Sequence, residues 1–177
     1  MSTLLAESLF GTAQLEMIYL SPALAADADK AVAGAPKFFA DEFDALPEPG
    51  FVADLLEAPP PPGVSRVAVF PIGIREKNGR DFIGLAHMVI GYPTETELFI
   101  GLLLIAEASQ RKGYGREFMQ GIYAWGRSQG IVFVRVRVRP RHTGARAFLD
   151  KLGFADLPNK LSTGHEVWQR KIPAVEE

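Results

Sequence analysis

One stretch of the chain, residues 98–129, constrains the fold more than any other part. Residues 98–105 are nearly all apolar, which is typical of a strand covered on both faces of a sheet. After a short loop with two glycines, residues 115–129 have the apolar spacing of a helix that buries one face, and Gly130 follows as a left-handed cap. A buried strand that leads through a tight loop into an amphipathic helix predicts an α/β fold.

The segments around this stretch extend the same pattern. Before it, the Asn78-Gly79 pair lies between two β-rich runs and predicts a type I′ hairpin turn, because Asn-Gly supplies the positive φ angles of that turn. After it, a short helix begins at Thr143 and ends at Gly153. The predicted strands are 67–75, 82–92, 98–105, 132–139 and 165–172, and the predicted helices are 115–129 and 143–152. We therefore expect a mixed sheet with helices packed on it.

The first third of the chain is rich in Ala and Pro and carries weaker signals. We expect a strand at 14–20, a helix at 22–32 after the N-cap Ser21, and a short helix at 51–57. The proline run at 59–63 then interrupts regular structure. It lacks the flanking pattern of a ligand for proline-reading modules, so it predicts a stiff loop.

Composition excludes several classes of protein. With 177 residues, 47% of them hydrophobic, the chain can bury a core as one domain. The net charge of -2 argues against a non-specific nucleic-acid binder. The sequence has no cysteine and only 3 histidines, which excludes disulfides and cysteine nucleophiles and disfavours a metal site. No apolar run approaches the roughly 18 residues that span a bilayer and no signal-peptide pattern is present, so we expect a cytoplasmic protein without membrane contact.

The loop at 110–115 carries the residues that indicate chemistry. Gly113 and Gly115 precede a helix N-terminus, where unpaired amide N–H groups and a partial positive charge favour an anion. Because several successive amides point to one side, a pyrophosphate fits better than a single phosphate. The basic residues around the loop are Arg111, Lys112 and Arg116. Taken alone, the glycines could equally form a plain tight turn, and the loop matches neither the P-loop nor the dinucleotide-binding pattern.

Two motifs together resemble the GNAT superfamily of N-acetyltransferases. The segment Gln110-Arg111-Lys112-Gly113-Tyr114-Gly115 is similar to the Q/R-x-x-G-x-G/A loop of that family. Thirty residues after that loop begins a second segment that resembles the family's short helix ending in Gly-Phe. Its matching residues are Ala145, Phe148, Leu149, Gly153 and Phe154. The resemblance extends over residues 66–172 with the elements in the expected order.

The resemblance implies a GNAT fold of the α/β (α+β) class. Its central sheet would be mixed and mostly antiparallel, with about six or seven strands, splayed fourth and fifth strands, and about four helices. One domain over residues 1–177 would consist of a variable part at 13–63 on the acceptor side and a cofactor-binding core at 66–172. Acetyl-CoA would enter the V-shaped opening between the splayed strands, and no metal is implied.

The resemblance also implies which residues contact acetyl-CoA. Backbone groups near the end of the fourth strand would bind the pantetheine arm, the loop would hold the pyrophosphate, and the short helix would line the far side. The implied cofactor-binding residues are Leu103, Leu104, Ile105, Gln110, Arg111, Lys112, Gly113, Tyr114, Gly115, Arg116, His142, Ala145 and Phe148.

This chain departs from the family pattern at two positions. His142 stands where the family often has Asn, and Leu149 stands where it often has the Tyr that protonates the leaving thiolate. A coenzyme A thiol resembles cysteine, with a pKa near ~8.5, so its thiolate is a tolerable leaving group without that Tyr. Water or His142 could supply the proton, so His142 is a candidate catalytic residue.

A second catalytic group is needed on the acceptor side, because a lysine-type amine with a pKa near ~10.4 must lose a proton before it attacks. Glu97, near the start of the fourth strand, is the first candidate base, and His87 is the second and a candidate substrate-binding residue. The alternative for Glu97 is a solvated hairpin charge close to Glu95, and for His87 a satisfied strand histidine.

Arginines alternate with valines in the strand at 132–139 and place positive charge beside the expected opening. One hypothesis is that Arg137 pairs with a carboxylate or phosphate of the acceptor. The alternative is a row of surface arginines paired with acids such as Asp81 or Glu107. A nucleic-acid role is not expected, because no aromatic residues are interleaved for stacking.

These observations predict an acetyl-CoA-dependent N-acetyltransferase that transfers an acetyl group directly to a primary amine in a ternary complex. The acceptor would be a small-molecule or peptide amine, and a homodimer is one plausible assembly. The alternatives are a non-catalytic acyl-CoA-binding or sensing domain, which Leu149 keeps open, and an interaction module with an empty cleft. The aromatic residues Phe38, Phe39, Phe43 and Phe51 could line an acceptor pocket, but packing under the loop is the expected role.

Overall fold

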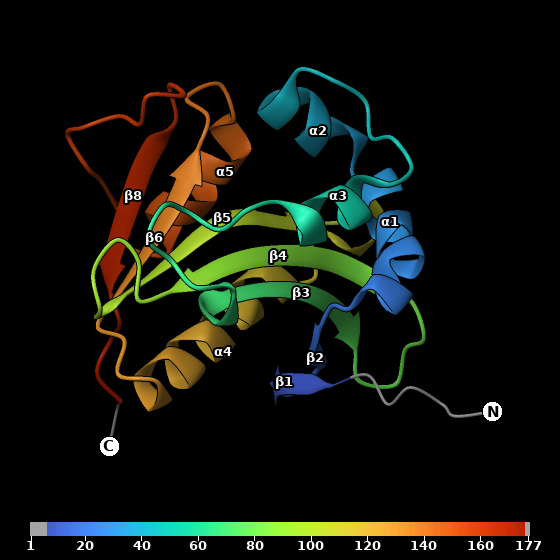
Figure 1. Cartoon of the computed structure of the whole chain (residues 1–177), viewed down its shortest axis with the longest axis horizontal. Coiled ribbons are helices and arrows are strands. Elements are labelled where there is room, and N and C mark those ends of the chain that lie inside the picture. Colours follow the sequence, from blue (N-terminus) through green and yellow to red (C-terminus); the bar gives the residue numbers. More distant parts are fainter. Residues whose placement is uncertain (1–6, 176–177) are drawn as a thin grey trace.

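The computed structural model describes residues 7–175, which form an eight-stranded sheet with helices on both faces (Figure 1). The strands lie in the order β1-β2-β3-β4-β5-β6-β8-β7. Their bounds are β1 Ser8–Gly11, β2 Leu15–Tyr19, β3 Val69–Glu76, β4 Phe82–Ile90, β5 Glu97–Ile105, β6 Phe133–Val138, β7 Ala155–Asp156 and β8 Glu166–Lys171. Within the described residues β5 and β6 pair in parallel and the other paired strands are antiparallel. The sheet is therefore mixed and mostly antiparallel, as predicted.

Two hydrophobic clusters cover the two faces of the sheet. Side chains of α4 and α5 belong to one cluster, and side chains of α1, α2 and α3 belong to the other. The helices are α1 Ala25–Ala33, α2 Pro36–Phe43, α3 Phe51–Glu57, α4 Tyr114–Ser128 and α5 Thr143–Lys151, with 3-10 turns η1 Pro22–Leu24, η2 Arg66–Ala68 and η3 Glu107–Ser109. None of the helices in residues 7–175 is long and apolar enough to cross a membrane.

The predicted fold class is confirmed, and the counts differ slightly. The structure adds the short strands β1 and β7 and the helix α2, none of which the sequence pattern indicated. β7 has 2 residues and β1 has 4, too few to show an alternating pattern. α2 has no side-chain cap at Ala35, and its N-terminal signal is limited to Pro36.

The predicted type I′ turn between β3 and β4 is wrong. Neither Asn78 nor Gly79 has a positive φ angle, which a type I′ turn requires of both central residues. The connection is longer than a two-residue hairpin loop, because the ladder resumes only at the Arg75–Phe82 pair. The chain instead turns directly after Glu76, whose carbonyl accepts a hydrogen bond from the Gly79 amide at 2.9 Å.

A β-bulge at Gly101 changes which face of the sheet the β5 side chains occupy. His87 pairs with Leu102 and Met88 pairs with Ile100, so Gly101 is the extra residue. Before the bulge, Ile100 lies in the cluster with α4; after it, Leu102 lies in the cluster with α1. The bulge thus bends β5 at the point where its pairing with β6 ends.

The strands β5 and β6 separate immediately after the bulge. Their parallel ladder runs from the Glu97–Phe133 pair to the Ile100–Val136 pair and stops there. Beyond it, the Gly101 carbonyl accepts a hydrogen bond from Arg137 Nε at 2.9 Å instead of from a strand amide. This is the splay between the fourth and fifth family strands that the sequence analysis expected.

Candidate active site

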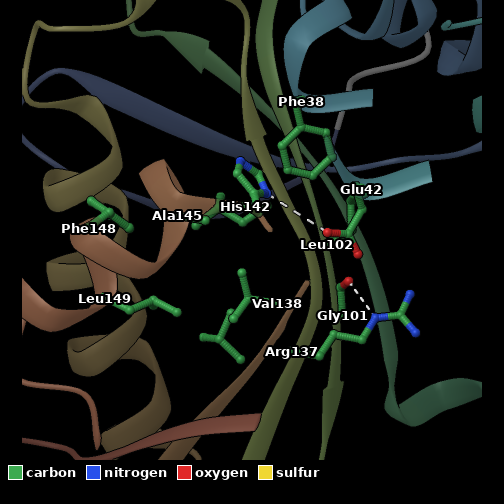
Figure 2. A pocket seen from close by; sticks show the side chains of 12 residues that line it. Phe38, Glu42, Gly101, Leu102, Arg137, Val138, His142, Ala145, Phe148 and Leu149 are labelled. Carbon is green, nitrogen blue, oxygen red and sulfur yellow. Dashed lines mark hydrogen bonds and ion pairs between the residues drawn. The ribbon is translucent and has the colours of Figure 1, made fainter. Parts of the chain in front are cut away.

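A pocket occupies the opening between β5 and β6. It contains about 420 Å³ of space, including its mouth to solvent. Figure 2 shows α2 side chains on one side of it and α5 side chains on the other. The lining residues are Phe38, Glu42, Gly101, Leu102, Leu103, Val136, Arg137, Val138, His142, Ala145, Phe148 and Leu149. Four residues of the sequence prediction, Leu103, His142, Ala145 and Phe148, therefore meet at one cavity together with Arg137.

The loop after β5 presents a row of free amides beside this opening. Within residues 7–175, no hydrogen bond uses the amide N–H groups of residues 111–116, because the first helical bond of α4 starts at Glu117. Gly113, the N-cap residue, has a φ angle of 79° and Arg111 has one of 64°, and this geometry turns successive amides outward. Free amides at the N-terminus of a fifteen-residue helix are suited to hydrogen-bond an anion.

Side chains of the loop divide into anchoring and exposed groups. Gln110 does not face the opening as a ligand; its Nε2 donates to the Ile105 carbonyl at 2.8 Å and fixes the loop to β5. Tyr114 is buried in the core, so only its amide is available. The exposed basic residues are Arg111, Lys112 and Arg116, none of which forms an ion pair with the described residues.

Gly115 has a packing role that the sequence did not indicate. A Cβ atom at this position would lie 3.2 Å from the Phe148 ring of α5. The glycine therefore lets the first turn of α4 approach α5, and Phe148 in turn lines the pocket.

The outer edge of β5 is open where the pantetheine arm is expected. Leu103, Leu104 and Ile105 pair with β4 on one side only, because the β6 ladder has ended by then. The backbone groups of this edge have no strand partner among the described residues, and the Ile105 carbonyl accepts from Gln110 of the following loop. A strand edge continuous with an anion site suits a long polar arm that carries phosphates.

Sequence reasoning missed a buried acidic residue at the pocket, Glu42 of α2, which is 5% exposed. Its Oε1 lies 2.7 Å from Nε2 of His165, and Nδ1 of His165 lies 2.6 Å from the Thr163 hydroxyl. Burial raises the pKa of Glu42, but the neighbouring His142 and His165 and the charge of Arg137 lower it more, so the pKa lies below its ordinary value. Glu42 is thus a buried carboxylate, held ionised by its neighbours.

His142 lies between this carboxylate and the pocket (Figure 2). Its Nδ1 is 3.9 Å from Glu42 Oε2, too far for a direct hydrogen bond, and its ring packs edge-on against Phe38 at 5.2 Å. Nδ1 is buried and has no hydrogen-bond partner within the described residues. This nitrogen therefore faces the Glu42 carboxylate, while the ring itself contributes to the cavity wall.

Glu97 does not line the pocket. It begins β5, four residues and about 13 Å before Gly101 along the strand. It is 7% exposed, and Arg135 Nε lies 2.5 Å from its Oε2, so the alternative of a solvated hairpin charge is wrong. The buried ion pair favours a structural role over that of a base.

The arginines of β6 and the following loop have partners other than those expected. Arg135 pairs with Glu97, Arg139 donates to the carbonyls of Glu42 and Thr163, and Arg141 lies 3.8 Å from Asp44. Pairing with Asp81 or Glu107 was therefore wrong. Arg137, which donates to the Gly101 carbonyl, differs from the others because it lines the pocket.

His87 lies outside this pocket and lines a second cavity on the same face of the sheet as Leu102. Its ring makes no hydrogen bond within the described residues, so the alternative of a satisfied strand histidine is not supported. Burial lowers the pKa of His87 and the charge of Arg137 lowers it further.

Most of the aromatic residues near α2 pack on one another. Phe39 has its ring 5.0 Å from that of Phe43 and 4.9 Å from that of Phe51. The expectation of packing is right for these three, whereas Phe38 lines the pocket. No group of three or more His, Asp or Glu side chains in residues 7–175 is arranged to hold a metal ion.

Comparisons with known proteins agree with this geometry. Among solved structures, an acetyltransferase from Thermus thermophilus is 22% identical and superposes with a TM-score of 0.74 over 92% of this chain and 99% of that one. The GNAT domain of S. lividans PAT gives 15% identity and a TM-score of 0.66 over 89% of this chain and 90% of that one. Spermidine N-acetyltransferase from Vibrio cholerae, solved with CoA and spermine, is 12% identical, with a TM-score of 0.67 over 90% of this chain and 96% of that one. At these identities the likeness concerns the fold.

A search of curated proteins finds no match. The family model "Acetyltransferase (GNAT) family" matches residues 37–154, which hold the open strand edge, the amide loop and the pocket helix α5. By fold and by sequence, the chain belongs to the GNAT family of acetyltransferases.

Proposed function

We propose that the protein is an acetyl-CoA-dependent N-acetyltransferase that passes an acetyl group directly to a primary amine of a small molecule or peptide. The observation that carries this proposal is the continuity of three features: the free amides of residues 111–116, the open edge of β5 and the pocket at the splay. These features fit acetyl-CoA along its length. The amides face its pyrophosphate, the strand edge faces its pantetheine arm and the pocket receives its thioester.

The residues of the chain then have distinct tasks. Arg111, Lys112 and Arg116 add charge at the phosphates, and free backbone N–H groups of β5 near Leu103 polarise the thioester carbonyl. A direct transfer requires no protein nucleophile, in keeping with a chain that has no cysteine.

The proton for the leaving thiolate has one candidate donor at the pocket. Leu149 is 2% exposed and has no hydroxyl to offer. We assign this task to His142, whose ring lines the cavity and whose Nδ1 faces Glu42. Glu42 is a positioning residue here, because its carboxylate lies 3.9 Å from that nitrogen and bonds to His165 behind it.

Calorimetric titration with acetyl-CoA tests the binding part of the proposal. In Gly113→Asp, a carboxylate stands among the loop amides, and we expect at least a hundredfold weaker binding, about 3 kcal/mol. Gly130→Asp is the matched control, because Gly130 also has a positive φ, 78° against 79°, and its Cβ would also meet nothing within 4 Å. Equal loss of affinity in both variants, or unchanged affinity in Gly113→Asp, would contradict the assignment.

A second function is favoured by one observation, the buried Leu149 in place of a hydroxyl donor. A non-catalytic acyl-CoA-binding domain would bind acetyl-CoA but release no free thiol with any amine. Thiol release measured in the presence of an amine panel separates the two functions, and His142→Gln should then lower the turnover rate without weakening acetyl-CoA binding.

A further inference from the structure

A second cavity of about 700 Å³ lies on the face of the sheet covered by α1, α2 and α3. Its wall is mainly apolar and includes Leu55 and Leu56 of α3 and Ala58, which follows that helix. The polar residues that line it are Tyr19, Arg66, His87 and Ser21. Such a cavity suits a molecule with an apolar body and a few polar groups.

This cavity adjoins the pocket at the splay. His87 lines the second cavity and Leu102 lines the first, and the two residues are directly paired across β4 and β5. Directly paired residues of an antiparallel ladder have their side chains next to each other on one face. Arg137, at the first pocket, is close enough for its charge to act on His87. A molecule in the second cavity therefore has its shortest route to the splay past His87.

The charge of the cavity is positive. No Asp or Glu lines it, and Arg66 forms no ion pair with the described residues. The guanidinium bonds only to two carbonyls at the end of α3, those of Leu56 at 3.5 Å and Glu57 at 3.4 Å. Its remaining N–H groups can bind an anion, whereas a polycation would meet no carboxylate here.

We propose that this cavity is the acceptor site, that it takes an amine with an apolar body and a carboxylate, such as an apolar α-amino acid, and that His87 is the base. The proposal rests on the proposed function. His87 takes one proton from the R–NH3+ group, and the free amine forms the N–C bond as the C–S bond breaks. The second amine proton leaves the new amide as the thiolate gains one, and His87 returns its proton to solvent.

The acceptor class is tested with three probes at saturating acetyl-CoA: L-phenylalanine, phenethylamine, which lacks the carboxylate, and spermidine. We expect kcat/KM to be about tenfold higher for L-phenylalanine than for phenethylamine, and lowest for spermidine. Arg66→Gln should abolish the difference between the first two, whereas Arg80→Gln, an exposed arginine outside the cavity, should leave it unchanged. A preference for spermidine, or equal values for the first two probes, would overturn the acceptor class.

The base is tested with His87→Gln. We expect kcat for L-phenylalanine to fall about a hundredfold near neutral pH, with little change in KM and none in acetyl-CoA affinity. The wild-type rate should lose activity in acid as His87 is protonated, with Tyr19, Arg66 and Arg137 as the other titratable or charged groups facing it. An unchanged kcat and an unchanged pH profile in His87→Gln would remove His87 from the reaction.

Filling the cavity provides a test with low risk to folding. Ala58→Phe changes an exposed residue on the cavity wall and should raise KM for L-phenylalanine at least tenfold by occupying the space. Val67→Phe is the control, because Val67 is 83% exposed and lines neither pocket. Unchanged KM in Ala58→Phe would place the acceptor elsewhere.

Binding of L-phenylalanine without acetyl-CoA separates this proposal from the proposed function. With only 3 histidines, the imidazole signals can be assigned by single His→Gln variants, and L-phenylalanine should shift the His87 signal first. If acetyl-CoA fails to bind, the proposed function fails and this titration alone decides the acceptor site. If acetyl-CoA binds and the His87 signal does not move, only the acceptor site fails.

Discussion

The two sides of the candidate site are built from different parts of the chain. The cofactor side uses one continuous stretch, residues 101–116, and works mainly through backbone amides and an open strand edge. The pocket wall that faces this stretch uses side chains from distant segments; Glu42 and His165, for example, are 123 positions apart in sequence and 2.7 Å apart in space. A backbone site needs local geometry, which glycine spacing reveals, whereas a side-chain cluster leaves no local pattern.

The two sides also differ in whether their basic side chains have partners. The loop at 111–116 exposes basic side chains and free amides without partners among the described residues. On the other side, the arginines of β6 are bound to carbonyls and carboxylates, and Arg137 bonds to Gly101. The basic side chains without partners therefore lie where we propose that the phosphates bind, and the arginines with partners connect the walls of the pocket.

The largest expected effect is on stability and comes from Glu42, which bonds to the buried His165. Glu42→Ala leaves the buried His165 without its partner and should lower the free energy of unfolding by about 3 kcal/mol. Glu42→Gln, which retains an oxygen acceptor, should cost less. Urea denaturation measures both, and acetyl-CoA affinity should change little, because the cofactor side does not depend on this carboxylate. If acetyl-CoA affinity falls in proportion to the free energy of unfolding in these variants, the two sides of the site are not independent.

Glu97 offers a smaller effect that sharpens the assignment of the base. Glu97→Gln removes the charge that faces Arg135 and should lower the free energy of unfolding by about 2 kcal/mol. The pH profile of the rate should keep its shape, because Glu97 lies outside the pocket. Glu95→Gln, at an exposed neighbour, is the control and should change neither property. A rate that falls at neutral pH and recovers at high pH would make Glu97 the base after all.

Gly115 tests whether the backbone site depends on tertiary packing. In Gly115→Ala the new Cβ lies 3.2 Å from the Phe148 ring and should push that ring into the pocket. We expect acetyl-CoA affinity to fall about tenfold, roughly 1.4 kcal/mol. The double variant Gly115→Ala, Phe148→Leu should recover most of the affinity, and calorimetry measures all three proteins. If the affinity for acetyl-CoA does not recover, Gly115 is needed for the backbone conformation of the loop and not for its contact with Phe148.

The smallest expected effect is on acid stability. The pKa of His87 is lowered in the folded state, so the unfolded chain binds the proton more readily. This contribution to stability is present above the ordinary value of 6.5 and is lost as the pH falls through the lowered folded-state value. Between about pH 7 and about pH 5, His87→Gln should therefore lose less stability than the wild type in urea titrations. Equal losses would show that His87 is as well solvated folded as unfolded.

The pKa of Glu42 is also lowered in the folded state. Glu42 therefore also stabilises the fold more at higher pH, but over a more acidic pH range. Its stabilising contribution is present above the ordinary value of 4.5 and is lost as the pH falls below it. Glu42→Gln should flatten the stability curve in that window and leave the His87 window unchanged. The two windows thus report separately on His87 at the second cavity and on Glu42 at the pocket between β5 and β6.

Particular residues show where sequence reasoning succeeded. Gly130 and Gly153 were predicted to end helices and have φ angles of 78° and 81°. The apolar alternation of β6 and the spacing of α4 predicted elements that the structure confirms within a few residues. These signals are local, because a helix cap or an alternating strand depends on neighbours in sequence.

Other residues could not be placed from sequence. In the sequence Glu97 resembled a solvated hairpin charge, but in the structure it forms a buried ion pair with Arg135. Arg135 lies beside it only once β5 and β6 are paired. Glu42 lies on a helix without a cap signal and has partners that come from the loop between β6 and α5 and from the segment before β8. The type I′ prediction failed since the turn geometry depends on where the β3–β4 ladder resumes.

By itself, the sequence determined the order of the main elements, the amide loop and the family to which the chain belongs, because these follow from periodicity and glycine spacing over a few neighbouring residues. The tertiary structure alone decided which acid lines the pocket, which arginine faces it and that His87 lines a second cavity beside Leu102 of the first. These facts depend on contacts between segments far apart in sequence, and on a single bulge at Gly101 that reverses the side chains of β5.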